Sequence, residues 1–314
     1  MNIAATWPEG SKMARPALTR WSPTTSSQAE PPAMHVVDTH AHFWDVEHIN
    51  YPWIEAGSVF DRSFLLADYQ ARSAGAPIRQ MVFVECDAHP RCSVQEAEWV
   101  TALAAEDRRI QAIVARTSLL DDDRAATLDH LGALPLLRGI RDNIQNNPAG
   151  FAVAPRFVEG VQEVHRRGLH FELCLTHHQL RETIELVDRC PDGQFVLDHC
   201  AKPDIASVGR EPWATEMAEM AERAHVVCKI SGLITEADWH RWTPDDILWY
   251  ARTAAELFGP DRILFGSDWP VSEAAGGFMT WFRLADALVA RWSEGDRDKF
   301  FRANAQRVYR LAPE

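Results

Sequence analysis

Several features that would assign the chain to a familiar class are missing from its sequence. No stretch approaches the roughly 18 apolar residues that a membrane-spanning helix needs. The N-terminus also lacks the apolar core, about 7–15 residues long, of a secretion signal. No block of Lys and Arg interrupts a chain whose formal net charge is -13, so neither nucleic acid nor a membrane is an expected partner.

Motifs based on closely spaced cysteines or glycines are absent as well. The six cysteines show no CxxC spacing, and most of them lie in apolar runs, where a thiol behaves as a small hydrophobic group. This usage predicts a reducing, cytoplasmic setting. No G-x-S-x-G pattern is present, which disfavours a serine nucleophile.

The 314 residues divide into an arm and one large domain. Residues 1–33 are rich in Pro, Ser, Thr and Ala without apolar periodicity, so they are expected to be a disordered arm. Met34 directly precedes the first strand and is an alternative start of the protein. Residues 34–314 are expected to form a single barrel domain.

Short apolar runs alternate with helical patterns through this domain. We expect strands at His35–His40, Met81–Cys86, Ile110–Ala115, Leu137–Arg141, His170–Leu175, Gln194–Asp198, Val226–Ser231 and Arg262–Phe265. We expect helices at Phe64–Ala74, Ser93–Glu106, Arg124–Leu131, Pro155–Arg167, Gln179–Cys190, Pro212–Ala224, Pro244–Phe258 and Phe278–Arg291. This alternation predicts an α/β fold, a (β/α)8 TIM barrel, with its active site at the carboxyl ends of the strands. The alternative, an open doubly wound sheet, lacks a glycine-rich turn after the first strand.

Polar residues at the strand ends are therefore the candidates for chemistry. The first strand ends in His40 and His42, whose i, i+2 spacing puts both imidazoles on one face, where they can chelate a divalent ion. Asp268 follows the eighth strand, which lies beside the first in a closed barrel. This carboxylate can bind a metal, accept a proton from water, or do both, whereas its alternative role is to cap a turn.

Other strands add further candidates at the same end of the barrel. His199 and Lys202 follow the sixth strand, and Arg141 ends the fourth, where a guanidinium suits a developing oxyanion. His177 and His178 follow the fifth strand, and only one of two adjacent histidines can face the site.

Buried charges and rim aromatics complete the candidate substrate contacts. Glu85 and Lys229 lie inside apolar strands, where a charge either contacts substrate or has a structural partner. Trp44 and Trp269 belong to a set of tryptophans after the strands that can line a pocket or pack loops. Both readings stay open for these four residues.

Taken together, these motifs resemble the sugar-lactonase group of the amidohydrolase superfamily, which includes L-fuconolactonase, L-rhamnonolactonase and 4-sulfomuconolactone hydrolase. The resemblance covers about residues 35–310 and rests on the segments 37–44, 51–53, 139–141, 196–204, 229–233 and 264–270. It implies a distorted, amidohydrolase-like TIM barrel and a hydrolase that opens the ring of a small-molecule lactone.

By position, the resemblance implies metal ligands and catalytic groups. The implied metal ligands are His40, His42, His178 and Asp268, and the implied catalytic residues are Asp268, His199 and Arg141. Members with two metals carry a lysine on strand four, which this chain lacks, so one divalent ion is implied, with Zn²⁺ expected. Whether turnover requires the ion stays open, as does His177 in place of His178.

Two alternatives remain at this stage. One is a metal-dependent decarboxylase or hydratase of the same superfamily that acts on an aromatic or unsaturated acid, and the other is a non-catalytic barrel. The sequence does not identify the lactone, and it leaves the oligomeric state open, a homo-oligomer included.

Overall fold

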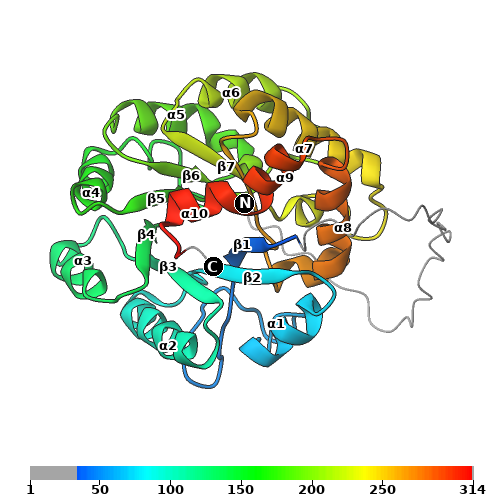
Figure 1. Ribbon diagram of the computed structural model, residues 1–314. Coiled ribbons are helices and arrows are strands. Elements are labelled where there is room, and N and C mark those ends of the chain that lie inside the picture. The colour runs from blue at the N-terminus through cyan, green and yellow to red at the C-terminus, as the bar shows by residue number, and fades with distance from the viewer. Residues whose placement is uncertain (1–33, 313–314) are drawn as a thin grey trace. The chain divides into compact units, whose positions relative to one another are not determined.

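The structure is a computed structural model that describes residues 34–312, so the arm expected at residues 1–33 lies outside the described residues. Eight parallel strands form one sheet in the order of the sequence (Figure 1). Their bounds are Val36–Ala41 (β1), Ile78–Val84 (β2), Ile110–Arg116 (β3), Leu137–Arg141 (β4), His170–Leu173 (β5), Phe195–Leu197 (β6), Val226–Ile230 (β7) and Ile263–Phe265 (β8).

Helices surround this sheet as an outer layer. Their bounds are Leu66–Ser73 (α1), Ser93–Glu106 (α2), Arg124–Gly132 (α3), Pro155–Arg166 (α4), Leu180–Asp188 (α5), Trp213–Ala221 (α6), Pro244–Phe258 (α7), Phe278–Leu288 (α8), Glu294–Asp298 (α9) and Asn304–Tyr309 (α10). The fold is the expected TIM barrel, and every expected strand and helix overlaps an observed one. The helices α9 and α10 were not expected.

The boundary signals of α7 show why the sequence predicts it well. Thr243 caps the helix by accepting a hydrogen bond from the backbone N–H of Asp246, whose carboxylate accepts in return from the Thr243 N–H at 2.7 Å. Pro244 occupies the first turn, and Gly259 ends the helix with φ +72°. Each of these residues favours its terminal position for a local steric or hydrogen-bonding reason.

The barrel closes between β1 and the segment that follows β8. Ala41 and Trp269 form a parallel bridge there. The Asp268 N–H donates to the His40 carbonyl at 2.8 Å, and the His42 N–H donates to the Trp269 carbonyl at 2.8 Å. This seam places Asp268 against the end of β1.

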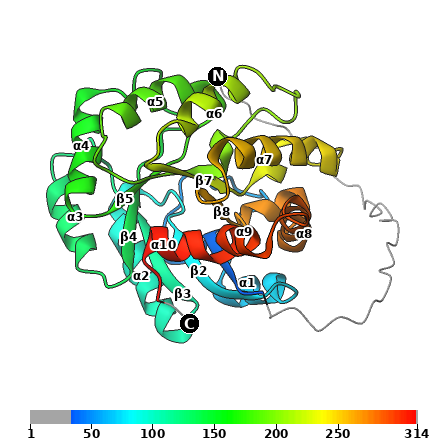
Figure 2. The same cartoon turned by 45° about the horizontal axis from the view of Figure 1, so that its top comes forward.

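At the opposite end, α10 covers the barrel interior. Its Ala305, Val308 and Tyr309 pack in one hydrophobic cluster with inward-facing residues of the strands, such as Val37 and Val227. Figure 1 looks along the barrel from this end, with α10 in red in front of the strands, and Figure 2 shows it after a tilt. The accessible end of the barrel is therefore the one where the strands finish.

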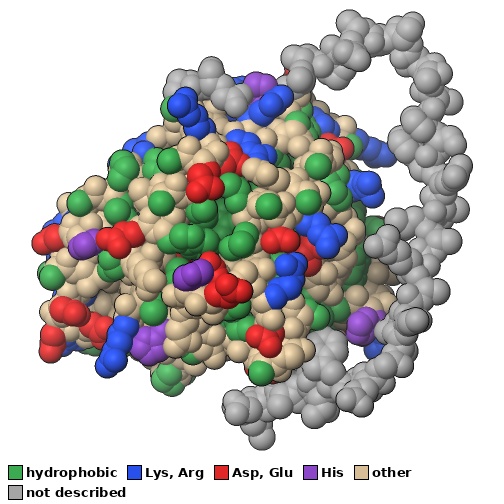
Figure 3. All heavy atoms as spheres, turned by 90° about the horizontal axis from the view of Figure 1, so that it is seen from below, with side chains coloured by type: hydrophobic (Ala, Val, Ile, Leu, Met, Phe, Trp, Pro, Cys, Tyr) green, Lys and Arg blue, Asp and Glu red, His purple; other side chains and the backbone are tan. Residues whose placement is uncertain are grey.

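The outer surface carries charged side chains of both signs (Figure 3). None of the described helices is long and apolar enough to cross a membrane. On the face in Figure 3, acidic and basic side chains are interspersed around exposed hydrophobic ones.

Candidate active site

Three imidazoles converge on one carboxylate at the carboxyl end of the barrel. Asp268 Oδ1 lies 3.5 Å from His42 Nε2 and 3.8 Å from both His40 Nε2 and His199 Nε2. All four side chains are buried. Their convergence joins β1, the segment after β6 and the segment after β8.

Glycines allow this close approach. A Cβ on Gly232, which has φ +65°, would lie 2.6 Å from Asp268 Oδ2 and 2.7 Å from His199 Nδ1. A Cβ on Gly266 would lie 2.7 Å from the Cβ of His40. Because a Cβ does not approach other heavy atoms so closely, these two positions require glycine in this arrangement.

His199 and Lys202 are presented by an unusual turn. Residues 199–202 all have positive φ, between 46° and 59°, although none is glycine. The indole N–H of Trp213 donates to the Cys200 carbonyl at 2.8 Å and so fixes the turn from outside. His199 Nδ1 lies 2.9 Å from Ser231 Oγ, which orients the ring. Left-handed backbone of this kind is unfavourable for residues with a Cβ and is enriched at functional sites.

The donors available at the site fit a divalent metal ion. His40, His42 and Asp268 form one group whose potential ligand atoms lie within 4.8 Å of one another. His42 Nδ1 lies 2.8 Å from the Val84 carbonyl, which can only accept a hydrogen bond. When Nδ1 carries the proton for this bond, the Nε2 of His42 has a lone pair available for a metal. Burial, and after it the charge of Lys229, lowers the pKa of His40 well below its usual range. Neutral imidazoles and a carboxylate are ligands that Zn²⁺ prefers.

A buried ionic network lies beneath these histidines. Lys229 Nζ lies 2.6 Å from Glu172 Oε2, 3.2 Å from Asp198 Oδ1 and 3.1 Å from His40 Nδ1. Asp198 also lies 3.4 Å from His40 Nδ1 and accepts from Arg141 Nη1 at 3.2 Å. The network holds the His40 ring from the side that faces away from Asp268.

The electrostatic environment keeps Asp268 ionised and His199 neutral. Burial raises the pKa of Asp268, but its interactions with the neighbouring rings of His199 and His42, and with the ammonium of Lys202, lower it below its ordinary value. The pKa of His199 falls to about 4, chiefly because the ring is removed from water. Thus the site contains a charged carboxylate beside an uncharged imidazole.

A hollow of about 350 Å³, the candidate catalytic pocket, lies at this end of the barrel. Six of the residues expected from the sequence line it. They are His42, Trp44, Arg141, His199, Lys202 and Asp268. His40 lies behind this surface, in contact with Asp268.

The remaining expected residues lie elsewhere. Glu85 is buried and pairs with Arg141, Lys229 belongs to the network described above, and Trp269 is fully buried in the core. These three residues do not line the catalytic pocket. For Glu85 and Lys229 these positions agree with a structural ion pair, and for Trp269 they agree with core packing.

The fifth-strand histidines also lie outside the metal group. His178 is exposed, and its ring packs 3.8 Å from that of His177. His177 Nδ1 lies 3.0 Å from the Lys202 carbonyl. Neither belongs to a group of potential metal ligands in residues 34–312.

The structure adds several polar residues to the site that the sequence motifs do not indicate. Asp198 and Glu172 hold Lys229, and Ser231 orients His199. Asn143 and Gln145 line the pocket after β4. Glu172 carried a usable signal, since a charge inside an apolar strand needs a partner.

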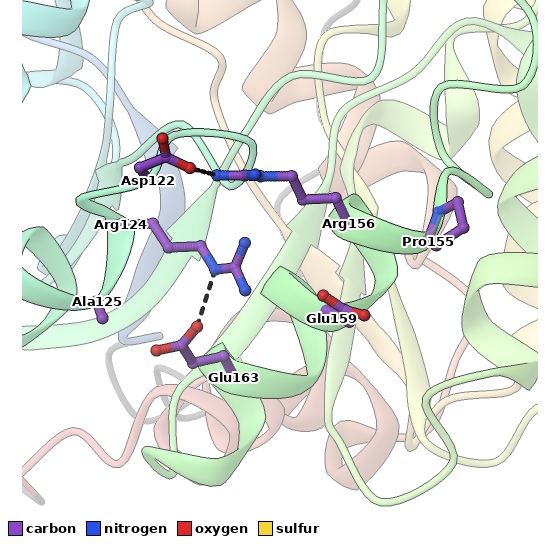
Figure 4. A pocket seen from close by; sticks show the side chains of 7 residues that line it. All are labelled: Asp122, Arg124, Ala125, Pro155, Arg156, Glu159 and Glu163. Carbon is purple, nitrogen blue, oxygen red and sulfur yellow. Dashed lines mark hydrogen bonds and ion pairs between the residues drawn. The ribbon is translucent and has the colours of Figure 1, made fainter.

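A separate hollow on the outside of the barrel, between α3 and α4, offers no catalytic arrangement. Figure 4 shows that its charged side chains face one another. Arg124 Nε donates to Glu163 Oε2 at 2.9 Å, and Arg156 pairs with Asp122. These charges neutralise each other at the surface.

The barrel and its histidine–aspartate cluster define the class of the protein. The family model described as amidohydrolase matches residues 37–311, so the chain belongs to the amidohydrolase family.

Particular relatives are similar along most of the chain. An L-fucono-1,5-lactonase from Burkholderia multivorans is 30% identical over 88% of this chain and 96% of its own length. A 4-sulfomuconolactone hydrolase from Rhizobium radiobacter is 25% identical over 82% and 83%. An amidohydrolase from Burkholderia multivorans, crystallised with bound zinc, superposes with a TM-score of 0.80 at 29% identity and covers 88% of this chain and 99% of its own.

Proposed function

We propose that the protein hydrolyses a small-molecule lactone, most suitably a sugar lactone, to the open hydroxy acid. The observation that carries the proposal is the single carboxylate, Asp268, surrounded by three imidazoles at the base of a pocket. The lactonase relatives support the reaction class. With a sugar lactone as substrate, the enzyme serves carbohydrate catabolism.

One divalent ion, with Zn²⁺ expected, completes the site in this proposal. His40, His42 and Asp268 would hold it, and His178 is not part of the set. When bound, the ion supplies Lewis acidity for attack on a carbonyl. The zinc in the similar Burkholderia amidohydrolase supports this assignment.

Asp268 is proposed as the group that moves the proton. Its lowered pKa keeps the carboxylate ionised near neutral pH, so it can accept the proton of the attacking water. The same carboxyl then returns that proton to the leaving hydroxyl as the ring opens. The lactone is thereby hydrolysed, and Asp268 returns to its ionised form.

His199 and Arg141 are proposed to stabilise the developing oxyanion. When the Ser231 hydroxyl donates to His199 Nδ1, the neutral ring carries its proton on Nε2, which faces the pocket side. Arg141 is held by Glu85 and Asp198, so its charge is fixed in place before substrate arrives.

Trp44 and Lys202 are proposed to contact the substrate from the pocket wall. Lys202 Nζ donates to Gln145 Oε1 at 2.7 Å, which leaves further donors on the ammonium. The proposal also includes a reducing, cytoplasmic setting, since all six cysteines are free thiols.

The test is a pH-indicator screen of sugar and muconate lactones with metal-analysed protein, with and without chelator. We expect acid release from at least one sugar lactone, loss of that activity with the chelator and recovery with Zn²⁺. Acid release from none of the lactones, or release of CO2 from an aromatic acid instead, would contradict the proposal.

A further inference from the structure

A second hollow adjoins the catalytic pocket. It measures about 370 Å³ and extends over the ends of β3 and β4. It shares four lining residues with the catalytic pocket, namely Asp87, Asn143, Gln145 and Asn146. A ligand seated over Asp268 can therefore continue past these four residues into the second hollow.

The wall between the two hollows is rich in side-chain amides. Four of the five residues from Asn143 to Asn147 are Asn or Gln, and all four line the second hollow. Each amide offers both donors and an acceptor. Asn143 Oδ1 is buried and has no hydrogen-bond partner among the described residues. A hydroxyl group on a ligand would satisfy it.

This amide segment is fixed in position. The backbone N–H groups of Ile144 and Gln145 both donate to the Cys174 carbonyl. Gln179 Nε2 donates to the Ile144 carbonyl at 2.8 Å, and Asn147 Nδ2 donates to the Asn143 carbonyl at 2.8 Å. A wall held in this way loses little conformational entropy when it binds a ligand.

The charges of the second hollow disfavour an anion. Asp87, Asp121 and Asp142 face one cation, Arg116, whose Nε lies 3.2 Å from Asp87 Oδ1. Burial raises the pKa of Asp142 to about 7, so this carboxyl is partly protonated near neutral pH and can donate as well as accept. The hollow is thus suited to neutral groups that exchange hydrogen bonds.

Apolar side chains also line the second hollow. They are Pro90, Leu120 and Phe151. A lining that combines apolar or aromatic side chains with hydrogen-bonding amides matches a sugar ring, which carries C–H groups on its faces and hydroxyls at its edge.

We propose that the second hollow is a subsite for a neutral polyhydroxylated group, a second sugar ring, attached to the lactone ring that is opened. The preferred substrate is then the lactone of a disaccharide acid rather than that of a single sugar. This inference rests on the proposed lactonase function and extends it from the reacting ring to the rest of the substrate.

The test compares kcat/KM for a monosaccharide lactone and for the disaccharide lactone that carries the same reacting ring. We expect the wild type to prefer the longer substrate about tenfold, the effect of a few added hydrogen bonds. Ser118 lines only the second hollow, so Ser118→Tyr should abolish the preference and leave hydrolysis of the monosaccharide lactone unchanged. The control Ser207→Tyr, at an exposed position outside both hollows, should keep it.

A binding measurement separates this inference from the proposed function. Calorimetry with the reduced disaccharide alcohol, which has no lactone, should detect binding to the wild type and to Ser207→Tyr but not to Ser118→Tyr. If no lactone is hydrolysed but this pattern holds, the lactonase proposal fails and the subsite stands. Equal kcat/KM for the two lactones, a preference retained by Ser118→Tyr, or binding of spermine in place of the neutral alcohol would overturn the subsite.

Discussion

Asp268 combines an unfavourable backbone with a favourable electrostatic position. Its φ of 55° is costly for a residue with a Cβ, by about 1–3 kcal/mol. Hydrogen bonds on both sides offset this cost, since its N–H donates to the His40 carbonyl and its carbonyl accepts from the Ser272 N–H. The strained turn directs the carboxylate toward the three imidazoles.

The first prediction concerns this carboxylate. Asp268→Asn should reduce kcat/KM for a lactone by about 10²–10⁴-fold, because an amide cannot accept the proton of the attacking water. Steady-state kinetics and circular dichroism measure activity and folding together. The matched control is Asp245→Asn, an exposed carboxylate in the first turn of α7, which should keep full activity. Activity above a tenth of wild type in Asp268→Asn would refute the assignment.

A second prediction concerns Glu96, a buried carboxyl on α2 that accepts a hydrogen bond from the Cys86 N–H. Burial, and then the charge of Glu85, raises its pKa from 4.5 to about 8. The folded state therefore keeps this proton where the unfolded state has lost it, so folding loses stability as pH rises from 4.5 to about 8. Glu96→Gln mimics the protonated form and should be more stable than wild type at pH 8.5, by about 1–3 kcal/mol.

Urea unfolding at pH 5 and pH 8.5 checks this expectation. The difference between Glu96→Gln and wild type should be small at pH 5 and should grow at pH 8.5. Glu98→Gln, on the exposed side of the same helix, is the control and should show no such growth. A constant difference at both pH values would mean that Glu96 does not titrate as stated.

At the residue level, the sequence predicted positions better than partners. His40, His42, His199 and Asp268 could be found because each follows an apolar strand, where polar residues are exceptional. The partners of Glu85 and Lys229 could not, because they depend on the register between distant strands. The amides at Asn143–Asn147 follow β4 in the same way, yet amides are common in ordinary loops and carry little signal.

At the level of elements, α10 links the closed end of the barrel to the active site. The hydroxyl of Tyr309 donates to Glu172 Oε1 at 2.7 Å, and the other oxygen of Glu172 accepts from Lys229 at 2.6 Å. Lys229 in turn contacts His40. A terminal helix thus takes part in orienting a residue at the opposite end of the strands.

The third prediction tests this link. Tyr309→Phe should lower the free energy of unfolding by about 1.5–3 kcal/mol, because a buried carboxylate loses a hydrogen bond. Urea unfolding measures the effect. Tyr250→Phe is the control, since the Tyr250 hydroxyl is buried and has no partner among the described residues, so its removal should cost nothing or stabilise. Equal losses in the two variants would show that the Tyr309 hydroxyl is not engaged.

The elements differ in how far the sequence determines them. The eight strand–helix pairs were predictable because apolar periodicity and capping residues mark each one locally. The short helices α9 and α10 follow the last pair, and the way α10 covers the barrel depends on tertiary packing. The left-handed turn at residues 199–202 contains no glycine, the residue type from which such a turn can be predicted.

For the whole molecule, the seam between β1 and β8 is the place where the barrel relies on side chains. Beside the bridge at Ala41, the Thr39 hydroxyl donates to the Phe265 carbonyl at 2.7 Å and Asp38 accepts from the Ser267 N–H at 2.8 Å. The proposed metal ligands come from both sides of this seam, His40 and His42 from one and Asp268 from the other. A bound ion would therefore fasten the first strand to the last.

At this position a bound metal would contribute to global stability, because a ligand that binds only the folded state stabilises it by mass action. Removing the metal should lower the melting temperature by about 5 °C, and Zn²⁺ at about 100 times its dissociation constant should restore it. Calorimetry of chelated and reloaded protein measures the shift. His42→Asn should abolish it, whereas His178→Asn, at an exposed histidine outside the proposed ligand set, should retain it in full. A shift that persists in His42→Asn, or disappears in His178→Asn, would move the metal away from the seam and toward the fifth strand.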